Sequence, residues 1–371
     1  MNNLIARVTK TLSQVIDPEL RRPITELGMV GNITESSSGF EVAIKLTVSH
    51  CPAAEQIEAN VNKVLTNEFD SGFTVVMEVM SAAELDSLKT MLRGSAEPKS
   101  NPFTTGRATK VFLLGSGKGG VGKSTITANL AVDLAGKGYE VGLIDADIFG
   151  FSIPGQLGLT AKPTRLDDMI LPPVIHGVKV ISIGMFLPSN EPVAWRGPML
   201  HKAIEQFLTD VYWGQLDFLL LDMPPGTGDV AISVGQLLPT AKSIVITTPQ
   251  QSAATVAERS GTAGLKTGQE IFGVVENSSY LLQPDGSKFE LYGSGGGRTV
   301  AESLSQVTGK EIPLLVQIPI SPELSVASDC GTPLVLTDST NPAAKAIQEL
   351  AGMLISDKLP ISARTLNVSV S

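Results

Sequence analysis

The chain has 371 residues, enough for two or three domains, with a formal net charge of −9 and an apolar content of 42%. This negative charge argues against a large non-specific nucleic-acid footprint, which needs clustered lysine and arginine. No apolar run approaches the roughly 20 residues that span a bilayer, and the first ten residues lack the apolar core of a signal peptide. We therefore expect a cytoplasmic protein that binds neither nucleic acid nor membrane.

Residues 1–93 have the pattern of a small α/β domain. The predicted helices and strands are, in chain order, Leu4–Val15, Phe40–Val48, Ala53–Leu65 and Phe73–Val79. The polar, proline-containing stretch 94–107 is expected to be a linker. At the other end of the chain, residues 357–371 are polar and are expected to form a disordered tail.

Residues 108–356 alternate between short apolar strands and longer helical patterns. Strands are predicted over Val111–Leu114, Glu140–Ile144, Val178–Ile183, Leu216–Leu221, Ser243–Thr248, Ile271–Val275 and Leu314–Ile318. Helices are predicted over Ser124–Ala135, Pro198–Val211, Ala253–Lys266, Thr299–Thr308 and Ala343–Ile355. This alternation predicts βαβ units and a doubly wound, mostly parallel α/β sheet.

The most informative motif follows the first of these strands and fits G-x-x-x-x-G-K-[ST], the loop that cradles phosphates. Its predicted ligand-binding residues are Gly117, Lys118, Gly119, Gly120, Val121, Gly122, Lys123, Ser124 and Thr125. Glycines let backbone N–H groups approach phosphate oxygens, and a helix N-terminus favours anions. Lys123 is predicted to pair with the β- and γ-phosphates, and the Ser124 hydroxyl to bind Mg²⁺.

Acidic residues end two further strands of the predicted sheet, where open α/β sheets bind ligands. Asp222 is expected to support Mg²⁺, and the N–H of Gly226 in the loop that follows to face a γ-phosphate. Of the pair Asp145 and Asp147, the second is the better candidate for orienting the attacking water, and we assign Asp145 to cofactor binding. Lys118 precedes the cradle and is expected to project toward a partner's site.

These residues resemble the deviant phosphate loop of the MinD/ParA class of ATPases. Within that class the chain is similar to the Mrp/ApbC group of iron–sulfur cluster carriers through Trp195–Met199, Trp213–Asp217, Asp222–Asp229, Val275–Asn277 and Gly293–Gly297. The first domain, through Asp17-Pro-Glu19 and Cys51-Pro52, resembles the SufT/PaaD type, which is also tied to iron–sulfur assembly.

The resemblance implies a homodimer that sandwiches two ATP molecules, hydrolyses them with Mg²⁺, and serves iron–sulfur apoproteins or assembly factors. It implies that Lys118 reaches the partner's nucleotide, that Asp147 orients water, and that Asp222 lies behind the Mg²⁺ ligands. It also implies that Asn277 pairs with the adenine edge. The residues themselves leave open whether Lys118 acts in its own subunit, and they do not assign Arg196 or Glu276.

The chain departs from this pattern in one respect. Carriers of this group have a Cys-Pro-x-Cys pair that bridges a cluster across the dimer, whereas Gln283 and Gly286 fall at about those positions here. Iron–sulfur clusters are held chiefly by thiolates. Cys51 is therefore the remaining candidate ligand, because a position before a helix can expose a thiol and lower its pKa. A small buried thiol is the competing interpretation, and Cys330 is expected to be structural, at a helix end.

Three hypotheses follow from these patterns. The first is an ATPase of iron–sulfur cluster assembly or transfer that works through Cys51 or through a partner. The second is a MinD/ParA-like switch ATPase with a positioning role, which the acidic charge and the non-amphipathic tail disfavour. The third is a nucleotide-binding scaffold without hydrolysis, which the intact Asp147 and Asp222 argue against.

Overall fold

The structure is a computed structural model, and it describes residues 2–36, 39–48, 51–69, 72–93, 101–104, 108–148, 150–186, 197–226, 229–250, 256–257, 261, 265 and 268–357. The chain divides into two compact units, which are described one at a time. Unit 1 contains residues 1–100 and 161–174, and unit 2 contains residues 101–160 and 175–371. Most of the predicted linker, residues 94–100 and 105–107, lies outside the described residues.

Unit 1 is built on a three-stranded sheet in the order β1-β2-β3, in which β2 runs antiparallel to β1 and parallel to β3. Its elements are α1 (Asn2–Leu12), β1 (Val30–Ser36), β2 (Gly39–Leu46), α2 (Ala54–Glu68), β3 (Gly72–Val79) and α3 (Ala82–Arg93), with the antiparallel pair β6 (Thr164–Leu166) and β7 (Met169–Leu171). The alternation along β2 buries Val42 and Ile44, and α2 buries Ile57, Val61 and Leu65.

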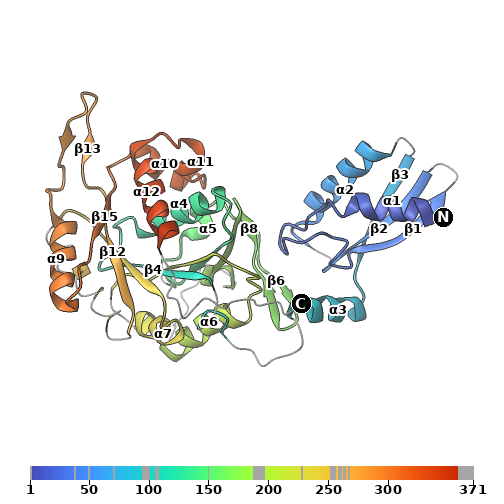
Figure 1. The fold of residues 1–371 in the computed structure, drawn as a ribbon, viewed down its shortest axis with the longest axis horizontal. Coiled ribbons are helices and arrows are strands. Elements are labelled where there is room, and N and C mark those ends of the chain that lie inside the picture. Colours follow the sequence, from blue (N-terminus) through green and yellow to red (C-terminus); the bar gives the residue numbers. More distant parts are fainter. Residues whose placement is uncertain are drawn as a thin grey trace, which may run out of the picture. The chain divides into compact units, whose positions relative to one another are not determined.

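Unit 2 is an eight-stranded sheet flanked by helices, in the order β15-β12-β11-β4-β10-β5-β9-β8 (Figure 1). The strands in chain order are β4 (Lys110–Ser116), β5 (Val141–Asp145), β8 (Val174–Ile175), β9 (Val178–Ser182), β10 (Phe218–Asp222), β11 (Lys242–Thr247), β12 (Glu270–Glu276) and β15 (Leu314–Gln317). All neighbours from β15 to β9 pair in parallel. Their carboxyl ends therefore share one edge of the sheet, where ligands bind in such folds.

Helices cover both faces of this sheet. They are α4 (Lys123–Gly136), α5 (Ile153–Gln156), a 3₁₀ turn η1 (Ile183–Phe186), α6 (Gly197–Thr209), α7 (Asp229–Leu237), α9 (Gly296–Thr308), α10 (Pro322–Asp329), α11 (Leu334–Thr337) and α12 (Pro342–Ser356). Helix α4 lies against α12 in the main apolar core, and α9 packs with β12 in a second cluster. Strands β5 and β10 are buried along their whole length, as expected for parallel strands covered on both faces.

The predicted fold class is confirmed, and every strand predicted between 108 and 356 is present within a few residues of its expected bounds. The helix predicted over Ala253–Lys266 falls largely outside the described residues. Asp357, the first residue of the predicted tail, forms an ion pair with Lys242 at 2.7 Å, and residues 358–371 lie outside the described part of the chain. The four-residue helices α5 and α11 were not predicted, because so few residues carry too little periodicity. The seven-residue strand β1 was not predicted, because its apolar residues Val30 and Ile33 do not alternate.

Candidate functional site

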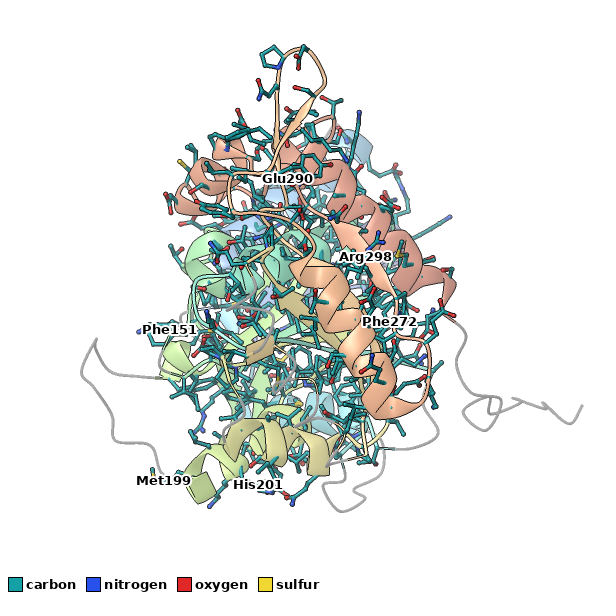
Figure 2. The ribbon with its side chains drawn as sticks, turned by 90° about the vertical axis from the view of Figure 1, so that its left-hand side faces the viewer. Phe151, Met199, His201, Phe272, Glu290 and Arg298 are labelled. Carbon is teal, nitrogen blue, oxygen red and sulfur yellow. The ribbon has the colours of Figure 1, made fainter. Side chains whose placement is uncertain are left out.

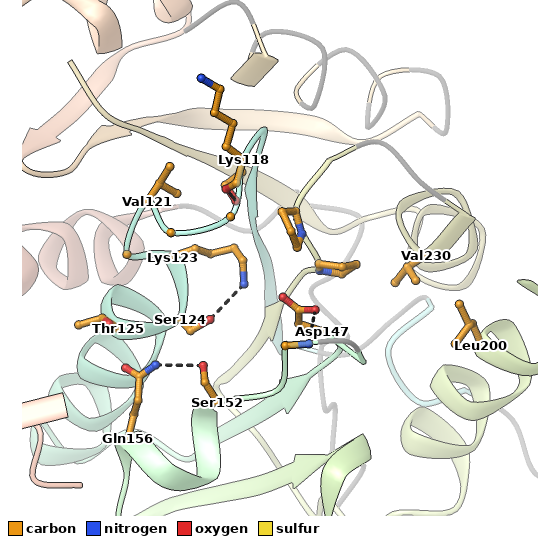
Figure 3. Close-up of a pocket in the computed structure, with 17 residues that line it drawn as sticks. Lys118, Val121, Lys123, Ser124, Thr125, Asp147, Ser152, Gln156, Leu200 and Val230 are labelled. Carbon is orange, nitrogen blue, oxygen red and sulfur yellow. Dashed lines mark hydrogen bonds between the residues drawn. The ribbon is translucent and has the colours of Figure 1, made fainter. Parts of the chain in front are cut away.

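A cavity of about 790 Å³ opens at the carboxyl edge of the unit 2 sheet. The loop between β4 and α4 forms one wall, and Asp147 lies opposite Lys123 and Ser124 (Figure 3). Its lining includes Ser116, residues 118–125, Asp147, Gly150, Ser152, Gln156, Leu200, Pro224, Pro225 and Val230. The structure thus brings most of the predicted loop and one predicted acid into a single cavity.

Helix α4 begins at this cavity without a capping side chain. Its N-cap residue, Gly122, has a φ of +82°, a left-handed conformation that L side chains rarely adopt, and no side chain caps the helix. No acidic residue lies in the first turn. Uncapped N–H groups at the start of a 14-residue helix form a site that favours anions.

Three side chains meet at the carboxylate of Asp222, which ends β10 and is fully buried. Lys123 Nζ lies 2.7 Å from Asp222 Oδ2, and the Ser124 hydroxyl donates to the same oxygen at 2.6 Å. Thr127 Oγ1 donates to the other oxygen, Oδ1, at 3.0 Å. Because Lys123 is only 6% exposed, this is a buried ion pair. Each charge offsets the free-energy cost of burying the other.

A second carboxylate lies directly beside Asp222. The register of β10 on β5 pairs Asp222 with Asp145, which is also fully buried. Burial, and next the negative charge of Asp222, raise the pKa of Asp145 to about 7. Asp145 accepts hydrogen bonds from the backbone N–H groups of Asp147, Ser152 and Ile153 at 3.1–3.2 Å. Asp145 therefore holds the segment that carries Asp147.

Other predicted residues tie the loops around the cavity together. The Asn277 amide donates to the carbonyl of Val121 at 2.8 Å, and the N–H of Gly226 donates to the carbonyl of Ser116 at 2.8 Å. The side chain of Lys118 points away from Lys123 and Asp147 (Figure 3). These contacts place Asn277 and Gly226 beside the cradle without testing their expected contacts with a ligand.

Several lining residues were not predicted. Gln156 and Ser152 join through a hydrogen bond of 3.0 Å, and Leu200 and Val230 bring apolar surface from α6 and α7 (Figure 3). None belongs to a recognisable phosphate motif, because side chains on separate helices meet only through tertiary packing. The adjacent Pro224 and Pro225 could have been found, since they directly follow the strand that ends in Asp222.

The predicted cluster ligand Cys51 lies in unit 1, where it is buried near two acidic residues. Its residue is 8% exposed, which supports the competing interpretation of a small buried thiol over that of an exposed one. The lowered pKa expected for the exposed thiol is wrong, because burial, assisted by the charges of Glu19 and Asp17, raises the thiol pKa to about 11. Backbone N–H groups of Ala53 and Ala54 favour the thiolate but do not outweigh burial.

The second cysteine, Cys330, and the expected Cys-Pro-x-Cys position both lie in unit 2. Cys330 is an exposed free thiol at the C-cap of α10, which confirms the expected helix end. The segment after Tyr280 forms a hairpin of β13 (Leu281–Leu282) and β14 (Lys288–Phe289) joined by a turn. Among the residues that the structure describes, no group of three or more His, Cys, Asp or Glu side chains could hold a metal ion.

Comparisons with known proteins agree with this geometry. Residues 107–355 match the family model described as "NUBPL iron-transfer P-loop NTPase", and residues 5–71 match "Iron-sulfur cluster assembly protein". Unit 2 is accordingly a nucleotide-binding unit of the P-loop NTPase class, with the MinD/ParA-like fold that the sequence predicts.

Similarity to named proteins covers nearly the whole chain. An iron-sulfur cluster carrier protein of Mycobacterium leprae is 49% identical over 372 residues, covering 100% of this chain and 97% of that protein. The carrier protein of Bacillus subtilis is 38% identical, covering 93% of this chain and 95% of its own length. A solved nucleotide-binding protein of Archaeoglobus fulgidus, in complex with ADP, is 37% identical over 60% of this chain and 86% of its own, with a TM-score of 0.51. The chain belongs to the iron–sulfur cluster carrier family of P-loop NTPases.

Within the described part of the chain, every helix is too short or too polar to cross a membrane.

Proposed function

We propose that this protein binds Mg²⁺–ATP in the unit 2 cavity, hydrolyses it as a cytoplasmic homodimer, and uses the cycle to assemble or transfer iron–sulfur clusters. The observation that carries the nucleotide part is the convergence of Lys123, Ser124 and Thr127 on Asp222 at an uncapped helix N-terminus. A lysine, a hydroxyl and a buried carboxylate beside free backbone N–H groups suit a phosphate chain with its metal.

The donor set fits Mg²⁺, which takes oxygen ligands and keeps several waters when it also binds phosphates. Ser124 Oγ would be the protein ligand, and Asp222, 2.6 Å from it, would hold the metal's waters. The ion supplies charge neutralisation on the phosphates when bound. Lys123 would then exchange part of its interaction with Asp222 for phosphate oxygens.

Hydrolysis needs an oriented water and compensation of the charge on the transferring phosphoryl group. We assign the water to Asp147, because its backbone is fixed by Asp145 and its side chain lines the cavity. Lys118 lines the cavity, but its side chain points away from Lys123 and Asp147, which supports a role at the partner's nucleotide. The Asn277 side-chain amide donates one hydrogen bond to the Val121 carbonyl of the phosphate loop. We assign its remaining N–H and its oxygen to hydrogen bonds with the adenine edge.

Substitution of the two loop lysines tests the nucleotide part. Lys123→Ala is expected to abolish ATP binding or to lower turnover by at least about 10²–10³-fold, because a preorganised charge is lost. Lys118→Ala should slow hydrolysis and leave nucleotide binding by the monomer intact. Lys137→Ala, which removes an exposed ion pair at the other end of α4, is the matched control. Full ATPase activity in Lys123→Ala would reject the site.

The cluster is cargo, and this chain offers few ligands for it. Cys51 and Cys330 are its only cysteines, and they lie in different units. We propose that Cys51 contributes a ligand once unit 1 opens, with a second subunit, an apoprotein or an assembly factor supplying the others. Anaerobic reconstitution with iron and sulfide, on wild type and Cys51→Ser, tests this. Visible absorption and iron content should fall in the variant, and equal loading would exclude Cys51.

One observation favours a second candidate, a MinD/ParA-like switch ATPase with a positioning or scaffold role and without cluster binding. The segment at the expected cysteine pair is a hydrogen-bonded turn in which Gly286 N–H donates to Gln283 at 2.9 Å. No thiolate can come from that turn. Wild-type protein that hydrolyses ATP but holds no iron after reconstitution would select this candidate.

A further inference from the structure

Glu276 is a buried acidic residue to which the sequence patterns assign no role. It ends β12, directly before Asn277, and it is 1% exposed. Burying a carboxylate costs free energy unless hydrogen bonds and nearby charge compensate it. The hydrogen-bond partners that the structure describes for this carboxylate are a backbone N–H and a side-chain amide, both neutral. Their positions show what the residue holds in place.

The carboxylate of Glu276 caps helix α9 and joins it to β15. Its Oε2 accepts from the backbone N–H of Gly297 at 2.6 Å, and its Oε1 accepts from the Gln317 amide of β15 at 2.8 Å. The N-cap residue of α9, Gly295, has no side chain for this purpose. A helix N-terminus favours negative charge, so α9 offsets the burial of the carboxylate. Figure 2 shows α9 facing the viewer, with Arg298 in its first turn.

The glycines at the start of α9 let the helix come this close to the strand ends. A Cβ at Gly297 would lie 2.8 Å from the Cβ of Glu276 and 3.0 Å from its Oε2. A Cβ at Gly296 would clash with the carbonyl oxygen of Pro249, which follows β11. The glycine run that the sequence singles out therefore serves the contact between α9 and the carboxyl edge of the sheet.

The end of β12 is also tied to the phosphate-binding loop. Asn277 donates from its backbone N–H to the Thr247 carbonyl and from its side-chain amide to the Val121 carbonyl, each at 2.8 Å. Ser278 follows with a φ of +55°, a strained conformation that persists only where surrounding contacts fix it. Because neighbouring side chains of a strand point to opposite faces, Glu276 reaches α9 on one face and Asn277 reaches the loop on the other.

We propose that Glu276 is a positioning residue, which fixes Asn277 so that its amide recognises the adenine base. This rests on the proposed function, in which Asn277 pairs with the adenine edge. With both carboxylate oxygens bonded, one to α9 and one to β15, the end of β12 is held against sliding or turning. The Asn277 amide, whose Nδ2 already donates to Val121, then presents its oxygen and its remaining N–H to the base in one orientation.

An amide held in one orientation distinguishes two purines. Adenine carries an amino donor at its 6-position, whereas hypoxanthine, the base of inosine, carries an oxygen acceptor there. The Asn277 oxygen accepts from the amino group of adenine, but in hypoxanthine it faces another acceptor, which disfavours binding. A mobile amide would turn to suit either base. Loss of the Glu276 contacts should therefore reduce the preference for adenine.

Substitutions of Glu276 separate the position of the carboxylate from its charge. The measurement is the ratio of the dissociation constants of inosine diphosphate and ADP, which are not hydrolysed, by calorimetry of the full chain with Mg²⁺. Glu276→Ala should lower this ratio at least about fivefold, the effect of about one hydrogen bond. Glu276→Gln, of equal length, should keep the ratio, because its oxygen still accepts from Gly297 and Gln317 can turn its amide. Glu276→Asp, which keeps the charge but is one methylene shorter, should behave like Glu276→Ala.

A matched control and a double-variant cycle sharpen this measurement. Glu302→Ala removes an exposed carboxylate from the same helix, α9, and should leave the ratio unchanged. In the Asn277→Ala background, Glu276→Ala should lower the ratio no further, because the carboxylate acts through that amide. A purely structural role would not give this dependence. Hydrolysis of ATP by Glu276→Ala should show the loss in KM rather than in kcat.

Several outcomes would overturn this role of Glu276. An unchanged ratio in Glu276→Ala, or an equal loss of affinity for both nucleotides, would show that the residue supports only the fold. A further fall in the Asn277→Ala background would overturn the role as well, and so would a wild type that binds both nucleotides equally. If Glu276→Ala does not fold, Glu276→Asp decides by the same ratio. Failure of the nucleotide site itself looks different, because the wild type would then bind neither nucleotide and the inference would fall with the site.

Discussion

Each unit of this protein buries two carboxyl groups together, and the pair in unit 2 differs from the pair in unit 1 by the lysine beside it. In unit 2, Asp222 is paired with the Lys123 ammonium and accepts from two hydroxyls. In unit 1, Asp17 accepts from two backbone N–H groups, and burial and the charge of Asp17 raise the pKa of Glu19 to about 7. In each pair one carboxyl, Asp145 or Glu19, has a pKa raised to about 7, and the unit 2 pair is in addition organised around the Lys123 ammonium.

The difference determines how readily each cluster can bind a metal or react in the described conformation. In unit 2, the carboxylate of Asp222 already has a lysine and two hydroxyls as partners, an arrangement that suits a metal and a phosphate chain. The thiol of Cys51, beside Glu19 and Asp17, has a pKa raised to about 11 and is inert as it stands. The thiolate of Cys51 needs a positive charge or access to water, which a metal or an opening of unit 1 would supply. In unit 2 the Lys123 ammonium already provides a positive charge beside Asp222. Unit 2 is thus poised for chemistry in the described conformation, and unit 1 is closed.

The largest expected effect is the contrast between the two thiols. At pH 8 a pKa of about 11 leaves roughly one Cys51 in 1,000 ionised, and the thiol is also buried. We expect iodoacetamide to modify the exposed Cys330 at least about 100-fold faster than Cys51, as measured by mass spectrometry of the two peptides. Guanidinium chloride should equalise the rates. Similar rates in the native protein would break the comparison, because Cys51 would then be an open thiolate.

Removal of the cation should make the unit 2 cluster resemble that of unit 1. Lys123→Met leaves Asp222 and Asp145 as uncompensated buried acids, and we expect the free energy of unfolding to fall by about 3–5 kcal/mol. Both tryptophans, Trp195 and Trp213, belong to unit 2, so fluorescence during urea unfolding reports this unit.

Two further variants sharpen this measurement. Lys137→Met, which breaks an ion pair of a lysine that is 38% exposed, should change stability by less than about 1 kcal/mol. Asp222→Asn in the Lys123→Met background should recover part of the loss, since it removes the orphaned charge. A loss in Lys123→Met no larger than that in Lys137→Met would show that the buried pair contributes little.

The contrast also separates what sequence patterns can predict from what they cannot. The phosphate loop and the acids at strand ends are local signals, because glycine spacing and strand termination are fixed within a few residues. The geometry of Cys51 depends on Asp17 and Glu19, more than 30 residues earlier, which come near it only in the folded domain. The sequence offered a helix N-terminus, which favours a thiolate, and burial reversed the sign.

The same reasoning applies inside the cavity. Gly122 and Lys123 were predicted from the loop itself, whereas Gln156, Leu200 and Val230 lie on three other helices. Nothing in their local patterns distinguishes them from ordinary packing residues. The register that sets Asp145 beside Asp222 is likewise a property of strand order, which alternating patterns do not specify.

The pH dependence of unit 1 is expected to be a smaller effect. The folded pKa of Glu19 is raised from 4.5 to about 7, so the native state holds this proton more tightly than the unfolded chain does. Stability is therefore highest below pH 4.5 with respect to this group and falls as pH rises to about 7, by about 3 kcal/mol in total. Glu19→Gln should abolish this fall.

Opening of unit 1 can be followed by the rate at which Cys51 is labelled in a Cys330→Ser background. The labelling rate at each pH is divided by that of a reference thiol peptide, which removes the effect of thiol ionisation. Glu26→Gln is the control, because its side chain is 53% exposed and pairs with Arg22 on the surface. A wild-type opening free energy that does not change between pH 5 and pH 8 would mean that Glu19 is ionised at no penalty.

The smallest expected effect concerns the tie between Asn277 and the loop. Asn277→Ala removes the 2.8 Å bond to Val121, and a hydrogen bond of this kind contributes about 1 kcal/mol. We expect ATP affinity, measured by calorimetry, to fall about fivefold. Ser279→Ala, which removes a bond of the same segment to Glu276, should leave the affinity unchanged. Equal affinity in Asn277→Ala would mean that the loop keeps its shape without this tie.

A double-variant cycle with Gly122 separates steric contact from backbone strain. A Cβ at Gly122 would lie 2.2 Å from Asn277 Nδ2, and the φ of +82° disfavours any L side chain. Gly122→Ala should therefore weaken ATP binding more than Asn277→Ala does. In the double variant the clash is gone but the strain remains, so the combined loss should be smaller than the sum of the two. Strict additivity would show that the amide and the cradle act independently, and that preorganisation in unit 2 resides in the ion pair alone.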